Sequence, residues 1–91
     1  MRKTKKLISV VGQAYADEIK RQFPESQPEV VLDAFDGFDV WVRIQAPAKL
    51  HERIRAAKSP LFGRFADETG VLVVSTEHEY DREEASTPSR A

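Results

Sequence analysis

Apolar residues recur at every fourth position over the first quarter of the chain. The positions with this spacing are Leu7, Val11, Tyr15, Ile19 and Phe23. A four-residue interval places side chains on one face of an α-helix, so the pattern predicts an amphipathic helix over residues 4–23. Thr4 is a candidate N-cap, and Pro24 ends the helix because proline lacks the backbone N–H that a helix interior requires.

Two runs of β-branched and aromatic residues follow, at positions 29–35 and 38–45. The dipeptide Asp36-Gly37 separates them, and Asp-Gly between such runs is a strong signal for a β-hairpin. We therefore expect two antiparallel strands that are joined by a tight turn at this dipeptide.

The length of the hairpin loop decides which side chains share a face. A two-residue loop would pair Phe35 with Phe38 and place Asp33 among apolar side chains. A three-residue loop of residues 35–37, with Gly37 in the left-handed conformation, avoids that burial, and we prefer it. One face then holds Val30, Leu32, Ala34, Phe38, Val40, Val42 and Ile44. On the opposite face Asp33 lies across from Asp39, Val31 across from Trp41, and Glu29 across from Arg43.

A second helix is expected to begin near Pro47, a favoured first helical position, and to end before Pro60. Its narrow buried stripe consists of Leu50, Ile54 and Ala57, with Leu61 as a further candidate. Residues 61–69 are expected to be irregular or to contain one short turn, with Phe62 and Phe65 filling the end of the core. The continuous apolar run at 71–76 predicts a third strand, which must lie at an edge of the sheet if the first two strands form a hairpin.

Together these elements predict an α+β fold. It is a small two-layer sandwich in the order α-β-β-α-β, with a three-stranded mixed sheet and two helices on one face. Residues 1–76 would form a single domain. Residues 77–91 are rich in acidic side chains and poor in apolar ones, so we expect them to form a disordered tail.

Composition narrows the possible functions. The chain has 91 residues, enough for one modest core, and a formal net charge of −1. It has no cysteine, which excludes disulfides, thiolate metal ligands and a cysteine nucleophile, and fits a cytoplasmic protein. No apolar run approaches the roughly 20 residues of a membrane span. Because His51 and His78 are far apart and no serine falls in a triad pattern, we expect no metal, no cofactor and no catalytic nucleophile.

In the preferred hairpin register, Asp33 and Asp39 face each other beside Trp41. Two opposed carboxylates can bind a cation, share a proton or hold a basic partner. The alternative is that both are solvated near the hairpin tip, where the effect of their repulsion stays under about 1 kcal/mol.

The turn and the second strand read Asp36-Gly37-Phe38-Asp39-Val40-Trp41-Val42. With the order helix, strand, turn, strand, helix, strand over residues 4–76, this segment resembles the core of the nucleotidyltransferase fold. That family holds magnesium and a nucleotide triphosphate with an Asp-x-Asp pair on this strand. Asp39 matches the first position, and Trp41 stands at the second. The resemblance therefore implies a degenerate member that has lost metal-assisted phosphoryl transfer, which needs paired oxygen ligands.

Four basic residues lie on the expected outer face of the second helix. They are Lys49, Arg53, Arg55 and Lys58. A cluster of cations can contact phosphates, so these residues are candidates for binding a nucleotide or a nucleic acid. The alternative is a solvated helix face, and the chain contains no RNA-recognition signature.

Two helices can cover only one face of a three-stranded sheet, so the other face is a candidate interface. With the third strand, it would comprise Val31, Phe35, Trp41, Val71 and Val73. An exposed apolar surface of this kind marks a binding site. We therefore expect a small non-enzymatic interaction module that forms a homodimer or binds a protein partner. The alternatives are that the tail or residues 61–65 cover this face, or that the domain binds nucleotide or nucleic acid.

Overall fold

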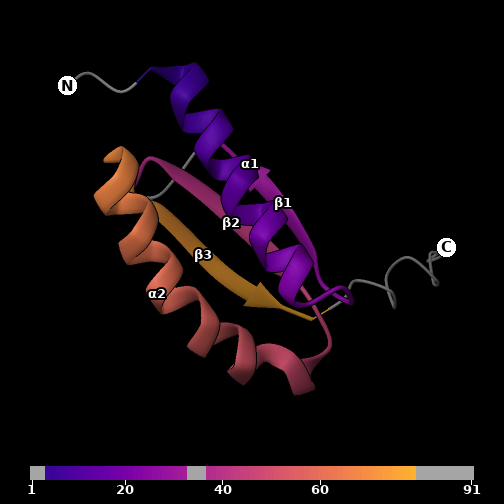
Figure 1. Cartoon of the computed structure of the whole chain (residues 1–91). Coiled ribbons are helices and arrows are strands. Elements are labelled where there is room, and N and C mark those ends of the chain that lie inside the picture. The colour runs from indigo at the N-terminus through magenta and orange to yellow at the C-terminus, as the bar shows by residue number, and fades with distance from the viewer. Residues whose placement is uncertain (1–3, 33–36, 80–91) are drawn as a thin grey trace, which may run out of the picture.

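The structure is a computed structural model that describes residues 4–32 and 37–79. Its elements are α1 (Lys5–Gln22), β1 (Gln27–Val31), β2 (Val40–Gln45), the short 3₁₀ helix η1 (Ala48–Leu50), α2 (His51–Thr69) and β3 (Val73–His78). Two helices lie on a three-stranded mixed sheet (Figure 1), which confirms the predicted α-β-β-α-β sandwich. Among the described residues, no helix is both long and apolar enough to cross a membrane.

The first helix follows its sequence pattern closely. The Thr4 hydroxyl accepts a hydrogen bond from the Leu7 N–H at 3.0 Å, which satisfies one of the amino-terminal donors that a helix leaves unpaired. The face toward the sheet consists of Val11, Gly12, Tyr15, Ala16 and Ile19. At the other end the Phe23 N–H reaches the Ile19 carbonyl at 2.8 Å, and the chain turns at Pro24.

β2 is the central strand of the sheet. β1 pairs with it antiparallel and β3 pairs with it parallel. Val31 pairs with Trp41 and Glu29 pairs with Arg43, which confirms the register that the three-residue loop predicted. Gly37 has a φ of 91°, the positive value expected of it. Residues 33–36, which include Asp33 and Phe35, lie outside the described residues.

The core lies between the sheet and both helices. Val40, Val42 and Ile44 point from β2 toward the helices and are fully buried. Tyr15 and Ile19 of α1 and Ile54 of α2 are equally inaccessible and complete the centre of the core. Leu32 and Phe38, which were expected on this face, are 51% and 39% exposed. They lie beyond the paired ends of β1 and β2, so the apolar face extends less far than the pattern predicted.

The second helix was expected to end before Pro60, and this prediction is wrong. α2 continues through Pro60 to Thr69 and ends at Gly70, whose φ is 77°. Proline inside a helix costs roughly 3 kcal/mol. Leu61 and Phe65 offset this cost, because both are buried in the core and full burial of each such side chain contributes roughly 1.5–3 kcal/mol.

The third strand is displaced from its predicted limits. β3 runs from Val73 to His78, so Glu77 and His78 belong to the sheet rather than to the tail. The domain therefore includes at least these two residues beyond position 76. Tertiary pairing explains the extension, because Ile44 and Gln45 at the end of β2 pair with Glu77 and His78.

Two glycines, one in each long helix, test how closely α1 packs against the sheet. A Cβ atom on Gly12 would lie 3.0 Å from Val40 Cγ2 and 3.1 Å from Val30 Cγ1, whereas one on Gly63 would meet nothing within 4 Å. We expect Gly12→Ala to lower the free energy of unfolding, because an overpacking cost of about 1–3 kcal/mol exceeds a gain in helix propensity of about 1 kcal/mol. Gly63→Ala should raise the same free energy by about 0.5–1 kcal/mol. Urea unfolding measures both values, and a stabilised Gly12→Ala variant would contradict the close approach of α1 to the sheet.

Candidate functional site

The sheet face that points away from the helices is made of alternate residues from all three strands. It comprises Gln27, Glu29 and Val31 from β1, Trp41, Arg43 and Gln45 from β2, and Val74, Thr76 and His78 from β3. We call this set the outer sheet face. Both described helices lie on the opposite side of the sheet (Figure 1), so no described helix covers it.

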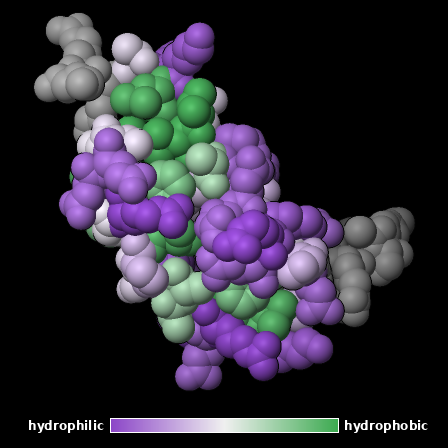
Figure 2. All heavy atoms as spheres, viewed as in Figure 1, coloured by the Kyte–Doolittle hydropathy of each residue, from purple (hydrophilic) through white to green (hydrophobic). Residues whose placement is uncertain are grey.

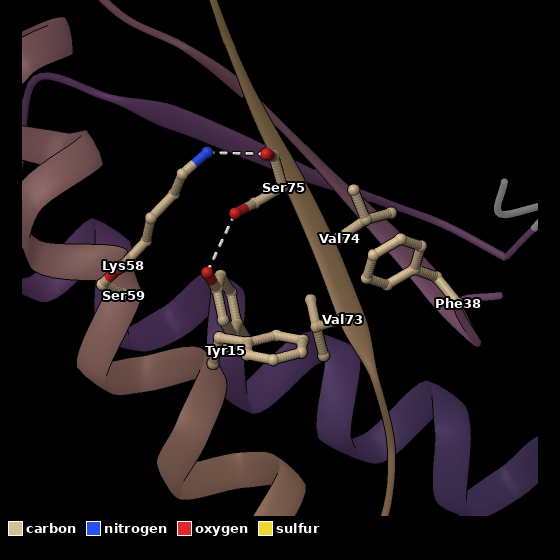
Figure 3. A pocket seen from close by; sticks show the side chains of 8 residues that line it. Tyr15, Phe38, Lys58, Ser59, Val73, Val74 and Ser75 are labelled. Carbon is tan, nitrogen blue, oxygen red and sulfur yellow. Dashed lines mark hydrogen bonds between the residues drawn. The ribbon is translucent and has the colours of Figure 1, made fainter.

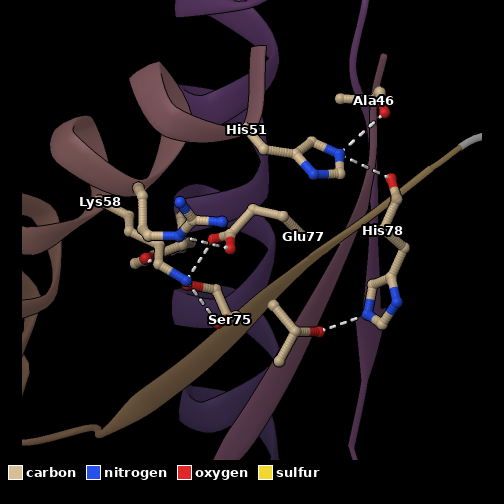
Figure 4. Close-up of polar contacts among 9 residues, drawn as sticks. Ala46, His51, Lys58, Ser75, Glu77 and His78 are labelled. Atoms are coloured by element: carbon tan, nitrogen blue, oxygen red, sulfur yellow. Dashed lines mark hydrogen bonds and ion pairs between the residues drawn. The ribbon is translucent and has the colours of Figure 1, made fainter. Parts of the chain in front are cut away.

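Trp41 lies on the central strand of the outer sheet face. Its indole Nε1 donates a hydrogen bond to the Thr76 hydroxyl at 2.9 Å. The same hydroxyl lies 2.6 Å from Nε2 of His78 (Figure 4), so three side chains from β2 and β3 form one hydrogen-bonded row. This row orients the half-buried side chain of Trp41.

A second polar group lies beneath the sheet, among the helices. Because β3 runs parallel to β2 with Ser75 beside Val42 and Glu77 beside Ile44, these two polar side chains point toward the helix layer. The Tyr15 hydroxyl and the Ser75 hydroxyl share a hydrogen bond of 2.9 Å (Figure 3). The Lys58 ammonium donates to the Ser75 main-chain carbonyl at 2.7 Å.

Glu77 is the most buried charged side chain of this group. Its side chain is only 9% exposed, and its carboxylate forms ion pairs with Lys58 and with Nε of Arg55, the latter at 3.4 Å (Figure 4). A carboxylate removed from water needs such partners, because an unpaired buried charge is strongly destabilising. The two cations lie three residues apart on α2 and therefore face the same way.

Tyr15 has a perturbed acidity. Burial raises the pKa of its phenol above the ordinary value of 10.0, the hydrogen bond with Ser75 lowers it, and the negative charge of Glu77 raises it. Burial has the largest effect, so the net shift of the Tyr15 pKa is upward. The phenol is therefore protonated at neutral pH. It can donate or accept a hydrogen bond there, and it is unsuited to act as a nucleophile.

An open hollow of about 290 Å³ lies beside this polar group (Figure 3). Its lining residues are Tyr15, Phe38, Lys58, Ser59, Phe62, Val73, Val74 and Ser75. Most of the lining is apolar, and the rings of Phe38 and Phe62 meet edge to face with their centroids 6.4 Å apart. The ammonium of Lys58 is already held by Glu77 and by the Ser75 carbonyl.

The predicted interface is only partly at the surface. Val31 and Trp41 lie on the outer sheet face, and Phe35 lies outside the described residues. Val71 and Val73 are 0% and 2% exposed and belong to the core, so their side chains are not part of the outer sheet face. The direction of the side chains along β3 places Val74 on the outer sheet face and Val73 beneath the sheet.

Asp39, one member of the predicted acid pair, has a structural contact. Its carboxylate accepts a hydrogen bond from the Leu72 N–H at 2.9 Å, and its own N–H donates to the Leu72 carbonyl at 2.8 Å. These bonds join the chain before β2 to the chain before β3. The other member, Asp33, lies outside the described residues, so cation binding by the pair stays a prediction. Within residues 4–32 and 37–79, no three histidine or acidic side chains are grouped as a metal site.

The four predicted phosphate contacts are divided between two places. Lys49 and Arg53 line a shallow hollow with Glu25 and Leu50. Arg55 and Lys58 are turned toward Glu77 instead. The structure therefore does not gather the four cations at one point on α2.

His51 has a structural contact of its own. Its Nε2 lies 3.0 Å from the Ala46 carbonyl and 3.2 Å from the His78 carbonyl (Figure 4), where it can donate to both. The contact ties the start of α2 to the ends of β2 and β3. It explains why this histidine faces the sheet and is half-buried.

Sequence reasoning missed Ser75 and Glu77. A signal for them exists, because Val73, Ser75 and Glu77 alternate along the chain and the first of them is apolar, so all three share a face once the strand is known to reach position 78. Glu77 was assigned to the acidic tail instead, because other acidic residues follow it.

Comparison of the chain with models of known protein families, with curated protein sequences and with solved structures found no match.

The acidity of Tyr15 can be tested directly. Its pKa in the folded protein is raised above the unfolded value of 10.0, so the unfolded phenol ionises first as the pH increases. We expect this group's contribution to stability to be complete below pH 10 and to be lost as the pH rises through the folded pKa. Ultraviolet titration of phenolate formation in wild type and in Tyr15→Phe identifies the phase that belongs to Tyr15. An ordinary titration for that phase would show that the phenol is not buried.

Proposed function

We propose that this chain is a small non-enzymatic interaction module that binds a protein partner, or a second copy of itself, through the outer sheet face. The observation that carries this proposal is the position of both helices on one side of the sheet (Figure 1). The opposite side presents Trp41 on the central strand, where a partner can contact all three strands at once.

The chemistry of the outer sheet face supports an interface. Tryptophan and arginine are enriched among the residues that contribute most to protein–protein binding. The indole N–H of Trp41 is bonded to Thr76, so the Trp41 side chain loses less conformational entropy when a partner packs on the ring. Arg43 and Glu29 form an ion pair of 3.5 Å beside it, which gives the face both signs of charge.

The polar groups under the sheet give little support to catalysis. Glu77 is committed to Arg55 and Lys58, and the pKa of Tyr15 is raised rather than lowered. The Tyr15 and Ser75 hydroxyls bond to each other, and the Glu77 carboxylate is ion-paired with both cations, so these groups serve as partners for one another inside the fold. An interaction surface therefore accounts for the arrangement better than a reaction does.

The apolar residues on the helix side are a competing surface. Figure 2 shows hydrophobic residues gathered over the amino-terminal half of α1, where Val10 is among the most exposed large apolar side chains. The experiment below is designed to separate the two surfaces.

Light scattering over a range of protein concentrations tests the proposal. If a second copy is the partner, we expect the wild-type molar mass to rise with concentration and Trp41→Ala to weaken association at least about tenfold, as the loss of a central aromatic anchor does. Arg43→Ala, which leaves the indole in place, should weaken it less. Circular dichroism confirms that each variant is folded.

Val10→Ala is the matched control on the helix side. Weaker association in Val10→Ala together with unchanged association in Trp41→Ala would place the interface on α1 and contradict the proposal. If wild type is a monomer at every concentration, an affinity capture that compares wild type with Trp41→Ala takes its place. A failure to find any partner that depends on Trp41 would then end the proposal.

The alternative is a nucleotide- or nucleic-acid-binding domain, such as a degenerate nucleotidyltransferase. It would use Lys49, Arg53, Arg55 and Lys58. Glu77 pairs with Lys58, whose side chain is 20% exposed, and with Arg55, whose side chain is 59% exposed. The carboxylate offsets part of the positive charge of the group, so few counterions would be released and binding through these residues would be weak.

Salt dependence separates this alternative from the first proposal. We expect no measurable binding of mixed single-stranded RNA or ATP, even at low ionic strength, because the four cations are divided between two places and Glu77 offsets part of their charge. Fluorescence anisotropy with labelled RNA and nucleotide checks this expectation. Binding that falls steeply with salt and disappears in a Lys49→Ala and Arg53→Ala double variant would favour the alternative.

A further inference from the structure

β3 is an edge strand in the described part of the chain, with β2 on one side only. The Leu72 carbonyl bonds to the Asp39 N–H and the His78 carbonyl bonds to the Ala46 N–H, so the even-numbered residues direct their main-chain groups toward β2. Because direction alternates along a strand, the odd-numbered residues of β3 direct theirs outward. These residues are Val73, Ser75 and Glu77. An edge of this kind is a template for pairing with another chain.

A lysine occupies the middle of this edge. The ammonium of Lys58 donates to the outward carbonyl of Ser75 at 2.7 Å (Figure 3). The same ammonium is ion-paired to the Glu77 carboxylate, and the Lys58 side chain is only 20% exposed. It is therefore held from two sides, unlike a lysine that moves freely in solvent.

Ser75 is also the position about which two copies of β3 would pair. In an antiparallel pair with two-fold symmetry, Ser75 would face Ser75 of the second copy, and Val73 would face Glu77. In each of these facing pairs, the main-chain N–H and C=O groups that point away from β2 would form the hydrogen bonds between the two copies. The Ser75 carbonyl lies at the centre of that arrangement, and an incoming N–H would compete for it with the Lys58 ammonium.

We infer that Lys58 is a block on the β3 edge that prevents two copies of this chain from pairing strand to strand. Displacing the ammonium would free the Ser75 carbonyl and would also remove a cation from a Glu77 carboxylate that is largely excluded from water. The ion pair between Lys58 and Glu77 thus opposes displacement of the ammonium from the Ser75 carbonyl. Association is left to surfaces other than β3, and the inference holds whether or not the outer sheet face binds a partner.

The test removes the ammonium and keeps the length of the side chain. We expect Lys58→Met to raise the molar mass toward about twice that of wild type at the same concentration, as a two-fold pair requires. Amide hydrogen exchange at Val73, Ser75 and Glu77 should slow by at least about tenfold in the associated form, because these are the N–H groups that an added strand would bind. Lys49→Met, which removes an exposed lysine away from the edge, should behave as wild type.

The double variant Lys58→Met and Glu77→Gln guards against a simple loss of stability. It removes both charges, so no buried carboxylate is left without a partner, and it should also pair through β3. A folded double variant that keeps the wild-type molar mass would overturn the inference. Association without slower exchange at the three β3 amides would overturn it as well, because the contact would then lie elsewhere.

Discussion

Burial of the central strand orders the rest of this molecule. Val40, Val42 and Ile44 are inaccessible to solvent, and they reach this state only when both helices lie on their side of the sheet. A shift of either neighbouring strand by one residue would reverse the direction of all its side chains. The pairing with β2 therefore determines that Val30 of β1 faces inward, and that Ser75 and Glu77 of β3 do so too.

The inward position of Glu77 links β3 to α2. A carboxylate in the helix layer must have cationic partners, and α2 supplies Arg55 and Lys58 within reach. Farther along the same helix, Leu61 and Phe65 are buried, and the Phe65 ring lies 5.8 Å from that of Tyr15. α2 thus supplies cations for Glu77 before Pro60 and apolar side chains for the core after it. The helix is continuous between these two parts.

These internal contacts divide the surface of the domain. On the helix side, Glu77 forms ion pairs with Arg55 and Lys58, and Lys58 also donates to the outward Ser75 carbonyl in the middle of the β3 edge. On the outer sheet face, Trp41 is held by Thr76 and remains half-buried among strand neighbours. No described helix covers that face. The proposed block on the β3 edge and the proposed interface are therefore consistent with each other, since both direct contact to the face of the sheet.

The sequence by itself determined α1, its Thr4 cap and the register of the β1–β2 hairpin. Each follows from a local rule: the four-residue period of a helix, the capping chemistry of threonine, and the need to keep Asp33 off an apolar face. Only the tertiary structure decided that α2 continues through Pro60, because the compensating burial of Leu61 and Phe65 depends on distant elements. It also decided the inward position of Glu77, since an acidic residue after an apolar run looks like the start of a tail until Lys58 and Arg55 are placed beside it. Periodicity is a property of neighbours in sequence, whereas the stabilisation of a buried charge or an interrupted helix comes from residues that only folding brings together.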